Sequence, residues 1–377
     1  MPTFVSIPED RLSVAAESRK NSIGFLRFLF AAMVLCSHSF TLGAFGPEPL
    51  TTLSQGRDSL GGVALQCFFV LSGFLITRSY AGGGSLFRFL WHRVLRIMPA
   101  FWVCLVVTAV VFGPLHYFTL NHTLEHYFTT PSSGPLSYVT RNSMLVMYQY
   151  DIFAMPIGIP DAGAFNGSLW SLEYEFRCYL YVAVVGVLGM LRRFVTAGIV
   201  VVAALMIVPM AAQNWPLVAA KVTWLGDGSM LRLMPSFFAG SLLYLLRRWI
   251  VLNRWAATAT CLVVIASLYV PALLPLRPLA LAYLVFWLAY RLPFHRFEAR
   301  GDFSYGFYIY AFPIQQTLAL WRVHALGVVI YIVASAVLTL ALAVASYHLV
   351  ERPCMRLKNV RVPLGRLRQV FRTDDVP

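Results

Sequence analysis

Long apolar segments, separated by short polar ones, run through almost the whole chain. Ten of them approach the length of about 20 residues that a helix needs to cross the hydrocarbon core of a bilayer. Two are weaker, because the fourth carries charged residues and the ninth is rich in aromatic residues and proline. The ten predicted spans cover residues 24–44, 58–78, 96–114, 169–190, 194–212, 230–246, 254–271, 276–292, 303–322 and 325–349.

This pattern predicts an all-α membrane protein, a polytopic bundle of about ten transmembrane helices. Residues 1–22 contain no cleavable signal pattern, so we expect the first apolar segment to be retained as a helix. We divide the chain into a cytoplasmic N-terminal segment (1–22), a transmembrane domain (23–352) and a basic cytoplasmic tail (353–377). An outer loop of about 115–168 is too long for a passive connector, so we expect it to be functional.

The composition excludes several classes of protein. Apolar residues make up 59% of the 377 residues, charged residues make up 12%, and the mean hydropathy is +0.69. A soluble domain has about 45–50% apolar and about 25% charged residues. Soluble globular, disordered and collagen-like chains are therefore excluded. The six cysteines lie in or beside spans without C-x-x-C spacing, and we expect them to be small buried residues.

The net charge of +14 is explained by the predicted topology. With the N-terminus inside, the inner segments hold 22 Lys and Arg residues and the outer segments hold six. This split favours both termini in the cytoplasm, because cytoplasmic loops are enriched in these residues. We attribute the charge to topology and to attraction by the anionic inner leaflet, so membrane lipid, and not nucleic acid, is the expected partner.

The first span carries two polar residues on one face. A charged group at the bilayer centre costs at least about 2.5–3.5 kcal/mol, which makes such groups functional candidates. Arg27 and His38 are eleven residues apart, so both side chains lie on the same side of a helix. Each alone is compatible with a structural role, Arg27 by snorkelling and His38 by bonding a neighbouring carbonyl. The shared face favours a polar seam that faces the bundle interior.

The fourth span carries two carboxylates that point to different helix faces. Glu173 lies four residues before Arg177, which predicts an ion pair within the helix. Glu175 has no such local partner. We expect it to pair with His38, because a carboxylate would fix the tautomer of the imidazole and raise its basicity.

A basic cluster lies between the second and third spans, where Arg88, Arg93 and Arg96 accompany His92. Arg93 and Arg96 are one helical turn apart and can face the same ligand. One interpretation is cytoplasmic topology alone. The other is a clamp for a phosphorylated cytosolic ligand, because guanidinium groups match the geometry of phosphate.

One motif in the outer loop resembles a metal site. Residues His122 to His126 fit H-x-x-E-H, the inverted zinc-protease pattern. Two histidines four residues apart can share a metal on a helix, but no domain surrounds this short segment to supply further ligands. We expect no metal here and favour a polar loop that faces the substrate. His116 nearby is compatible with either interpretation.

Several motifs in order make the chain resemble the acyltransferase-3 membrane proteins, which O-acylate surface carbohydrates in bacteria. The resemblance covers about residues 20–355. Each motif alone would be weak, but their order and spacing together are specific. They are Arg27 through His38 (R-x10-H), Gly61 to Val63 with Cys67 to Ile76 (F-F-x-L-S-G-F-L-I), Arg93 to Ala100 (R-x-x-R-I-x-P), Ser168 to Phe176 (S-L-W-S-L-x-x-E-F), and Ser304 to Pro313 with Ser346 to Pro353.

The resemblance implies transfer of an acetyl or other short acyl group from cytosolic acyl-CoA to a hydroxyl of a cell-surface or lipid-linked carbohydrate, in the bacterial inner membrane. Acetyl-CoA would be a co-substrate, with no bound cofactor. We expect Arg93, Arg96 and Arg88 to bind the donor, with help from Arg27. His38, oriented by Glu175, is expected to act as general base on the acceptor hydroxyl or as a transient acyl carrier.

The chain departs from the family pattern in the ninth span. Many relatives carry a His two residues before the proline, whereas this chain has Ala311, so the role of that His is absent or taken by Gln315 or Gln316. We expect a single membrane unit without the extracytoplasmic domain that some relatives carry.

The alternative function is a membrane transporter or flippase of an anionic metabolite or acylated glycolipid, which would also use buried Arg, His and Glu. Against it, the two halves show no matched pair of broken helices.

Overall fold

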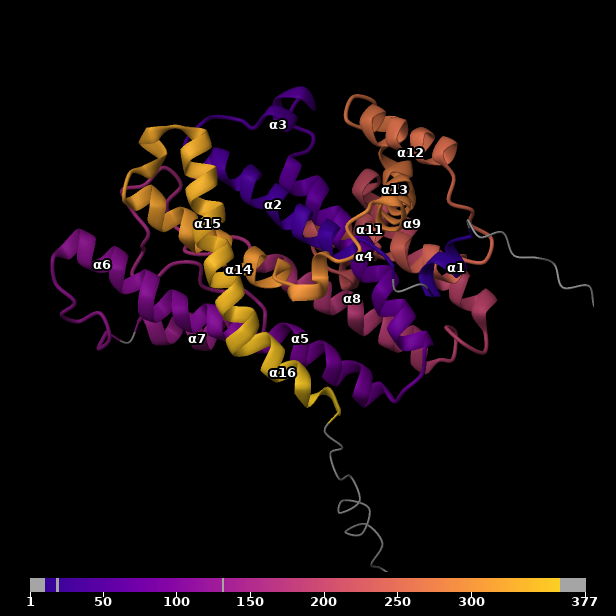
Figure 1. The fold of residues 1–377 in the computed structure, drawn as a ribbon, viewed down its shortest axis with the longest axis horizontal. Coiled ribbons are helices and arrows are strands. Elements are labelled where there is room, and N and C mark those ends of the chain that lie inside the picture. Colours follow the sequence, from indigo (N-terminus) through magenta and orange to yellow (C-terminus); the bar gives the residue numbers. More distant parts are fainter. Residues whose placement is uncertain (1–10, 18–19, 131, 360–377) are drawn as a thin grey trace, which may run out of the picture.

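A computed structural model of the chain describes residues 11–17, 20–130 and 132–359, and in these ranges it contains helices and loops but no strand (Figure 1). A helix lies in each of the ten predicted spans, so the predicted all-α fold is confirmed. These helices are α2 (Ile23–Leu42), α4 (Leu60–Ala81), α5 (Leu86–Val107), α8 (Trp170–Val187), α9 (Val195–Asn214), α11 (Gly228–Leu245), α12 (Arg254–Ser267), α13 (Arg277–Arg291), α14 (Ser304–Leu320) and α15 (Val328–Ser346).

The remaining helices are short. Two of the long helices continue through a π-helical turn, α5 through η1 (Thr108–Phe112) into α6 (Gly113–Asn121) and α15 through η6 (Tyr347–Glu351) into α16 (Arg352–Arg356). The others are α1 (Leu12–Glu17), α3 (Pro49–Leu53), α7 (Pro135–Asn142), α10 (Pro216–Lys221), η2 (Thr223–Leu225), η3 (Pro271–Leu276), η4 (Phe297–Arg300), η5 (Val323–Leu326) and η7 (Leu357–Asn359). Residues 360–377 of the predicted basic tail lie outside the described residues.

Within the described residues, six helical stretches are long and apolar enough to cross a membrane, which makes the chain a multi-pass membrane protein. They are Ile23–Leu42, Leu60–Ala81, Leu86–Asn121, Val195–Asn214, Pro271–Arg291 and Val328–Arg356. The count of about ten spans and the cytoplasmic position of both termini stay predictions.

The third predicted span begins earlier than expected, at Leu86 and not at residue 96. Ser85 caps this helix, because its hydroxyl accepts a hydrogen bond from the Arg88 N–H at 3.2 Å. Arg88, Arg93 and Arg96 therefore lie on the first turns of a helix and not in a connector. Hydropathy misplaced the boundary because these charged residues lower the apolar average.

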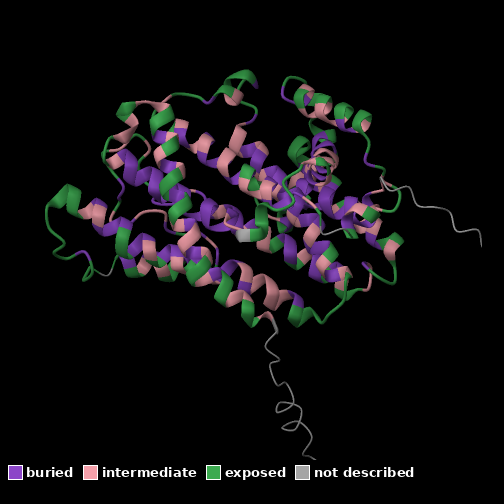
Figure 2. Cartoon of the chain, viewed as in Figure 1, coloured by how far each residue is buried: buried purple, intermediate pink, exposed green. Residues whose placement is uncertain are grey.

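Two helices form the centre of the bundle. Every residue of α11 from Met230 to Leu245 except Arg232, and of α14 from Ser304 to Ala319, is buried (Figure 2). By contrast, α15 exposes much of its apolar surface to the surroundings. Other helices therefore surround α11 and α14, and α14 contributes Ser304, Tyr305 and Tyr308 to the cavities described below.

Helices α4 and α11 cross in close contact at two glycines. A Cβ atom on Gly73 would overlap the carbonyl of Phe237, and one on Gly240 would overlap the carbonyl of Val70. The hydroxyl of Ser241 donates a hydrogen bond to the Gly73 carbonyl at 3.1 Å. Small residues allow helix backbones to approach closely in membranes. The glycine of the L-S-G-F-L-I motif is thus explained by packing.

Candidate active site

Two cavities lie inside the helical bundle and meet at a shared wall. The first, here called the arginine cavity, has a volume of about 120 Å³, and the polar groups that line it include Arg27, Ser72, Arg93, Arg96, Glu175 and Tyr179. The second, here called the histidine cavity, has a volume of about 320 Å³, and its lining includes His38, Glu48, Ser168, Trp170 and Arg232. Leu65 and Tyr308 line both cavities, so these two side chains separate them.

Three of the four predicted arginines line the arginine cavity. Arg27 comes from α2, while Arg93 and Arg96 come from adjacent turns of α5. Arg88 lies on the same helix but is exposed and does not line either cavity. The predicted convergence of Arg93 and Arg96 is therefore present in the structure, whereas Arg88 is separated from the cavity.

Asp302, just before α14, pairs with two of these arginines. Its Oδ2 atom lies 2.5 Å from Arg27 Nη1 and also bonds to Arg96 Nη2. Its other oxygen accepts a hydrogen bond from the Ser304 hydroxyl at 2.5 Å. Burial alone would raise the pKa of the Asp302 carboxyl, but the guanidinium groups outweigh burial and lower this pKa below its ordinary value. Asp302 therefore stays ionised and holds both arginines at the cavity.

Arg93 differs from its neighbours because it has no such partner. Among the described residues no ion pair or hydrogen bond holds its guanidinium, and its Nε atom is buried and unpaired. Arg96 is bonded by Asp302 and also lies 3.6 Å from Glu351. Arg93 is thus the cation of this cavity that is available to a ligand.

The predicted pairing of Glu175 with His38 is wrong in this structure. Glu175 Oε1 accepts hydrogen bonds from the Ser72 hydroxyl and, at 2.6 Å, from the Tyr179 hydroxyl. It faces the arginine cavity, whereas His38 faces the histidine cavity. Four residues along α8 separate Glu175 from Tyr179, so the helix itself supplies a partner that we had not considered.

The predicted ion pair between Glu173 and Arg177 is confirmed, and both residues lie on α8.

His38 lies on the face of α2 that forms one side of the histidine cavity. Val34, Ser37 and Thr41 share this face at helical spacing. The His38 ring packs edge-on against Phe312, with 5.4 Å between ring centroids, and its Nδ1 atom is buried without a hydrogen-bond partner among the described residues. The imidazole is thus held by packing and has a nitrogen free for a ligand.

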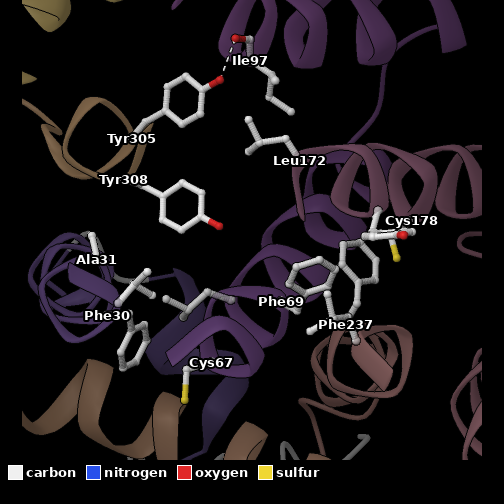
Figure 3. Packing of buried hydrophobic residues seen from close by; sticks show 14 of the residues in the cluster. Phe30, Ala31, Cys67, Phe69, Ile97, Leu172, Cys178, Phe237, Tyr305 and Tyr308 are labelled. Atoms are coloured by element: carbon white, nitrogen blue, oxygen red, sulfur yellow. Dashed lines mark hydrogen bonds between the residues drawn. The ribbon is translucent and has the colours of Figure 1, made fainter. Parts of the chain in front are cut away.

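The wall between the cavities is formed largely by one tyrosine of α14. The Tyr308 hydroxyl donates a hydrogen bond to the Ser168 carbonyl at 3.0 Å and lies 2.7 Å from the Ser171 hydroxyl. Figure 3 shows it one helical turn from Tyr305, whose hydroxyl donates to the Ile97 carbonyl. These bonds hold α14 against α5 and α8 and keep the wall in place.

The two glutamines of the ninth span form hydrogen bonds to backbone carbonyls of other segments. The Gln315 amide donates to the Leu35 carbonyl at 2.9 Å, and the Gln316 amide donates to the Asp161 and Ala164 carbonyls, both at 2.8 Å. Neither glutamine lines either cavity. They fasten α14 to α2 and to the predicted outer loop, and Ala311 is buried beside them in the core.

The H-x-x-E-H segment does not form a helix. His122 and His126 both have positive φ, at 55° and 66°, so the regular spacing that a helical metal site needs is lost. Among the described residues no group of three or more His, Cys, Asp or Glu side chains is arranged to hold a metal ion. His116 lies apart from these turns, buried against Phe165 with 5.0 Å between ring centroids.

Several residues at the cavities escaped the sequence-based prediction. Asp302 pairs with Arg27, and Ser72 and Tyr179 bond to Glu175. Tyr308 separates the two cavities, and Glu48 lines the histidine cavity. Asp302 carried one detectable signal, since it is an acidic residue next to a predicted span and close to the Ser304–Tyr305 motif. The others resemble ordinary polar residues of a membrane bundle.

Comparison with known proteins identifies the family of this chain. A family model described as "Acyltransferase domain" matches residues 20–348. The chain belongs to the acyltransferase-3 family. An "O-acetyl transferase" of Shigella phage Sf6 is 29% identical over 342 residues, which are 89% of this chain and 96% of that protein. "Nodulation protein 10" of Rhizobium leguminosarum bv. viciae is 29% identical over 374 residues, covering 91% of this chain and 95% of that protein. No solved structure matches.

Membership of this family, together with the apolar helices, makes the chain a membrane acyltransferase. The structure also places the motifs on which the resemblance rests. Arg27 and His38, the ends of the first motif, face the two different cavities of one bundle.

Proposed function

We propose that this acyltransferase moves an acetyl or other short acyl group from cytosolic acyl-CoA to a hydroxyl of a cell-surface or lipid-linked carbohydrate. The observation that carries the proposal is the pair of cavities, one rich in arginine and one containing His38, that meet at Leu65 and Tyr308. The name of the phage relative, an O-acetyl transferase, supports acetyl as the transferred group. The bacterial inner membrane is the proposed location.

The arginine cavity is the proposed donor side. Guanidinium groups bind phosphate well, and Arg93 is the unpaired one here. Arg27 and Arg96, held by Asp302, add positive charge around the thioester arm. Glu175 lies on this donor side, where its hydrogen bonds to Ser72 and Tyr179 hold three residues of the cavity lining together. The excess of Lys and Arg on the same side of the predicted topology supports a cytosolic donor.

The histidine cavity is the proposed acceptor side. His38 acts there as general base, taking the proton of the acceptor hydroxyl as its oxygen attacks the thioester carbonyl. The carbon–sulfur bond then breaks, and the proton passes to the thiolate of coenzyme A. If His38 instead carries the acyl group transiently, its ring nitrogen first attacks the thioester carbonyl and the carbon–sulfur bond breaks to release the thiolate of coenzyme A. The acceptor hydroxyl then attacks the acyl-imidazole, the carbon–nitrogen bond breaks, and the hydroxyl proton passes to the thiolate. Both routes need the imidazole at the wall between the cavities.

A labelled acyl group distinguishes this function from transport. We expect cells that contain the protein to incorporate label from acetyl-CoA covalently into surface polysaccharide, as detected by mass spectrometry, and cells without it to lose that mass increment. Movement of a labelled compound across the membrane with no covalent acylation of any glycan would contradict an acyltransferase acting on carbohydrate and would favour a transporter.

A further inference from the structure

Three residues that line the histidine cavity each have one buried polar atom without a hydrogen-bond partner. The atoms are His38 Nδ1, Glu48 Oε2 and Ser168 Oγ, and none has a hydrogen-bond partner among the described residues. Buried polar groups in proteins are nearly always hydrogen-bonded, and an unpaired one is costly. Three such atoms in one cavity indicate that a ligand supplies their partners.

Glu48 is held so that one of its oxygens remains free. Its Oε1 atom accepts hydrogen bonds from the Leu60 N–H and, at 3.3 Å, from the Thr51 hydroxyl. These bonds tie the carboxylate to α3 and to the start of α4, and the residue is only 5% exposed. Oε2 is therefore a fixed acceptor at the cavity, in need of a donor.

We propose that Glu48 binds the acceptor sugar, with Oε2 accepting a hydrogen bond from a hydroxyl adjacent to the one that His38 activates. This inference rests on the proposed function and adds a residue that binds the sugar and a second hydroxyl that the sugar must carry. An ionised carboxylate is an acceptor only, and the general base must also receive a proton, so the ligand has to provide two donors. A sugar ring with two neighbouring hydroxyls provides both, and the indole of Trp170 in the same cavity offers an apolar surface for the ring.

The substitution Glu48→Gln tests this role without removing the structural bonds. The amide oxygen replaces Oε1 and keeps its bonds to Leu60 and Thr51, while the NH2 group turns toward the cavity and cannot accept a hydrogen bond. We expect the KM for the acceptor to rise about 10- to 100-fold, as for a lost hydrogen bond to a charged group, while the KM for acetyl-CoA is unchanged. Glu17→Gln is the matched control, because Glu17 is an exposed carboxylate at the end of α1 and lines neither cavity.

The assay uses the purified full chain, labelled acetyl-CoA, and methyl α-D-glucopyranoside with its 2-, 3-, 4- and 6-deoxy derivatives. The wild-type protein should discriminate strongly against one deoxy derivative that still carries the acylated hydroxyl, and Glu48→Gln should lose that discrimination. The melting temperature of Glu48→Gln should match that of Glu17→Gln.

The outcomes separate the two proposals. Equal acceptor KM values and equal discrimination by the wild-type protein and Glu48→Gln would overturn the role of Glu48 and leave the proposed function intact. Failure of the wild-type protein to acylate any of these hexosides would instead count against a sugar acceptor, and therefore against both proposals.

Discussion

The two cavities differ in how their polar groups are satisfied. In the arginine cavity most charges are already paired, since Asp302 holds Arg27 and Arg96, and Ser72 and Tyr179 hold Glu175. In the histidine cavity the buried acceptors lack partners. The first therefore holds its cations in place before a ligand binds, and the second leaves groups of Glu48, Ser168 and His38 without partners, among the residues that the structure describes, beside the guanidinium of Arg232. Under the proposed function, this difference is the reason for placing the donor on one side of the wall and the acceptor on the other.

Removal of the imidazole should have the largest effect on the reaction. We expect His38→Ala to lower the rate of acyl transfer by about 10²–10⁴-fold, because it deletes the general base or the acyl carrier. The protein should still fold, since the loss is confined to one ring packed on Phe312. Labelled transfer is measured beside the melting temperature and the elution volume. Wild-type rates in this variant would remove His38 from the mechanism.

Neutralising Asp302 tests whether the arginine cavity depends on its internal pairing. Asp302→Asn removes the counter-charge that Arg27 and Arg96 share and leaves only the longer pair of Arg96 with Glu351, so the two guanidinium groups repel each other and move. We expect roughly 10- to 100-fold slower transfer and a lower melting temperature. Because the pKa of Asp302 is below its ordinary value, the carboxyl is ionised at neutral pH and the wild-type pairing does not change with pH there. Glu17→Gln serves again as the control, and an unchanged rate in Asp302→Asn would refute the positioning role.

Arg93 and Arg88 form a matched pair on one helix. Arg93→Ala should raise the KM for acyl-CoA about tenfold, because it removes the arginine of the cavity that has no hydrogen bond or ion pair within the described part of the chain and so can bind phosphate. Arg88→Ala should leave this KM unchanged, since Arg88 is exposed and lies outside the cavity. Initial rates at varied donor concentration provide the test. Equal effects of the two substitutions would indicate that the basic cluster reflects topology alone.

A substitution at Leu65, in the wall between the cavities, should have the smallest effect on the rate of transfer and no effect on donor binding. Leu65→Trp adds volume between the cavities, so we expect transfer to fall roughly three- to tenfold because the reacting atoms are held further apart. The affinity for acyl-CoA, measured by equilibrium binding, should stay the same, because Leu65 is apolar and does not bind phosphate. A loss of donor affinity equal to the loss of rate would place Leu65 in the donor site and contradict its role as a wall.

Much of the fold was predictable because bilayer length and hydropathy dominate it. Each predicted span contains a helix, and the one large boundary error, at Leu86, arose where arginines occupy the first turns of a helix capped by Ser85. The shared face of Arg27 and His38 followed from helical periodicity alone. Both residues do line the cavities.

The partners of these groups were less predictable, because they depend on contacts between distant helices. Asp302 and Arg27 are 275 residues apart in sequence, and no periodicity within a span indicates that they meet. The partner assigned to Glu175 was wrong for a similar reason, since a local tyrosine and Ser72 of α4 satisfied it instead. The two-cavity arrangement itself requires the packing of α2, α4, α8 and α14, and only the structure provides it.

The central claim is that donor and acceptor reach the wall from opposite sides of the membrane. The direct test uses sealed proteoliposomes containing the full chain in one orientation, with labelled acetyl-CoA on the side of Arg93 and a hexoside acceptor on the side of His38. We predict labelled, acylated sugar in this arrangement and none when the two substrates are exchanged. Equal product in both arrangements, or product only when both substrates share one side, would contradict the account.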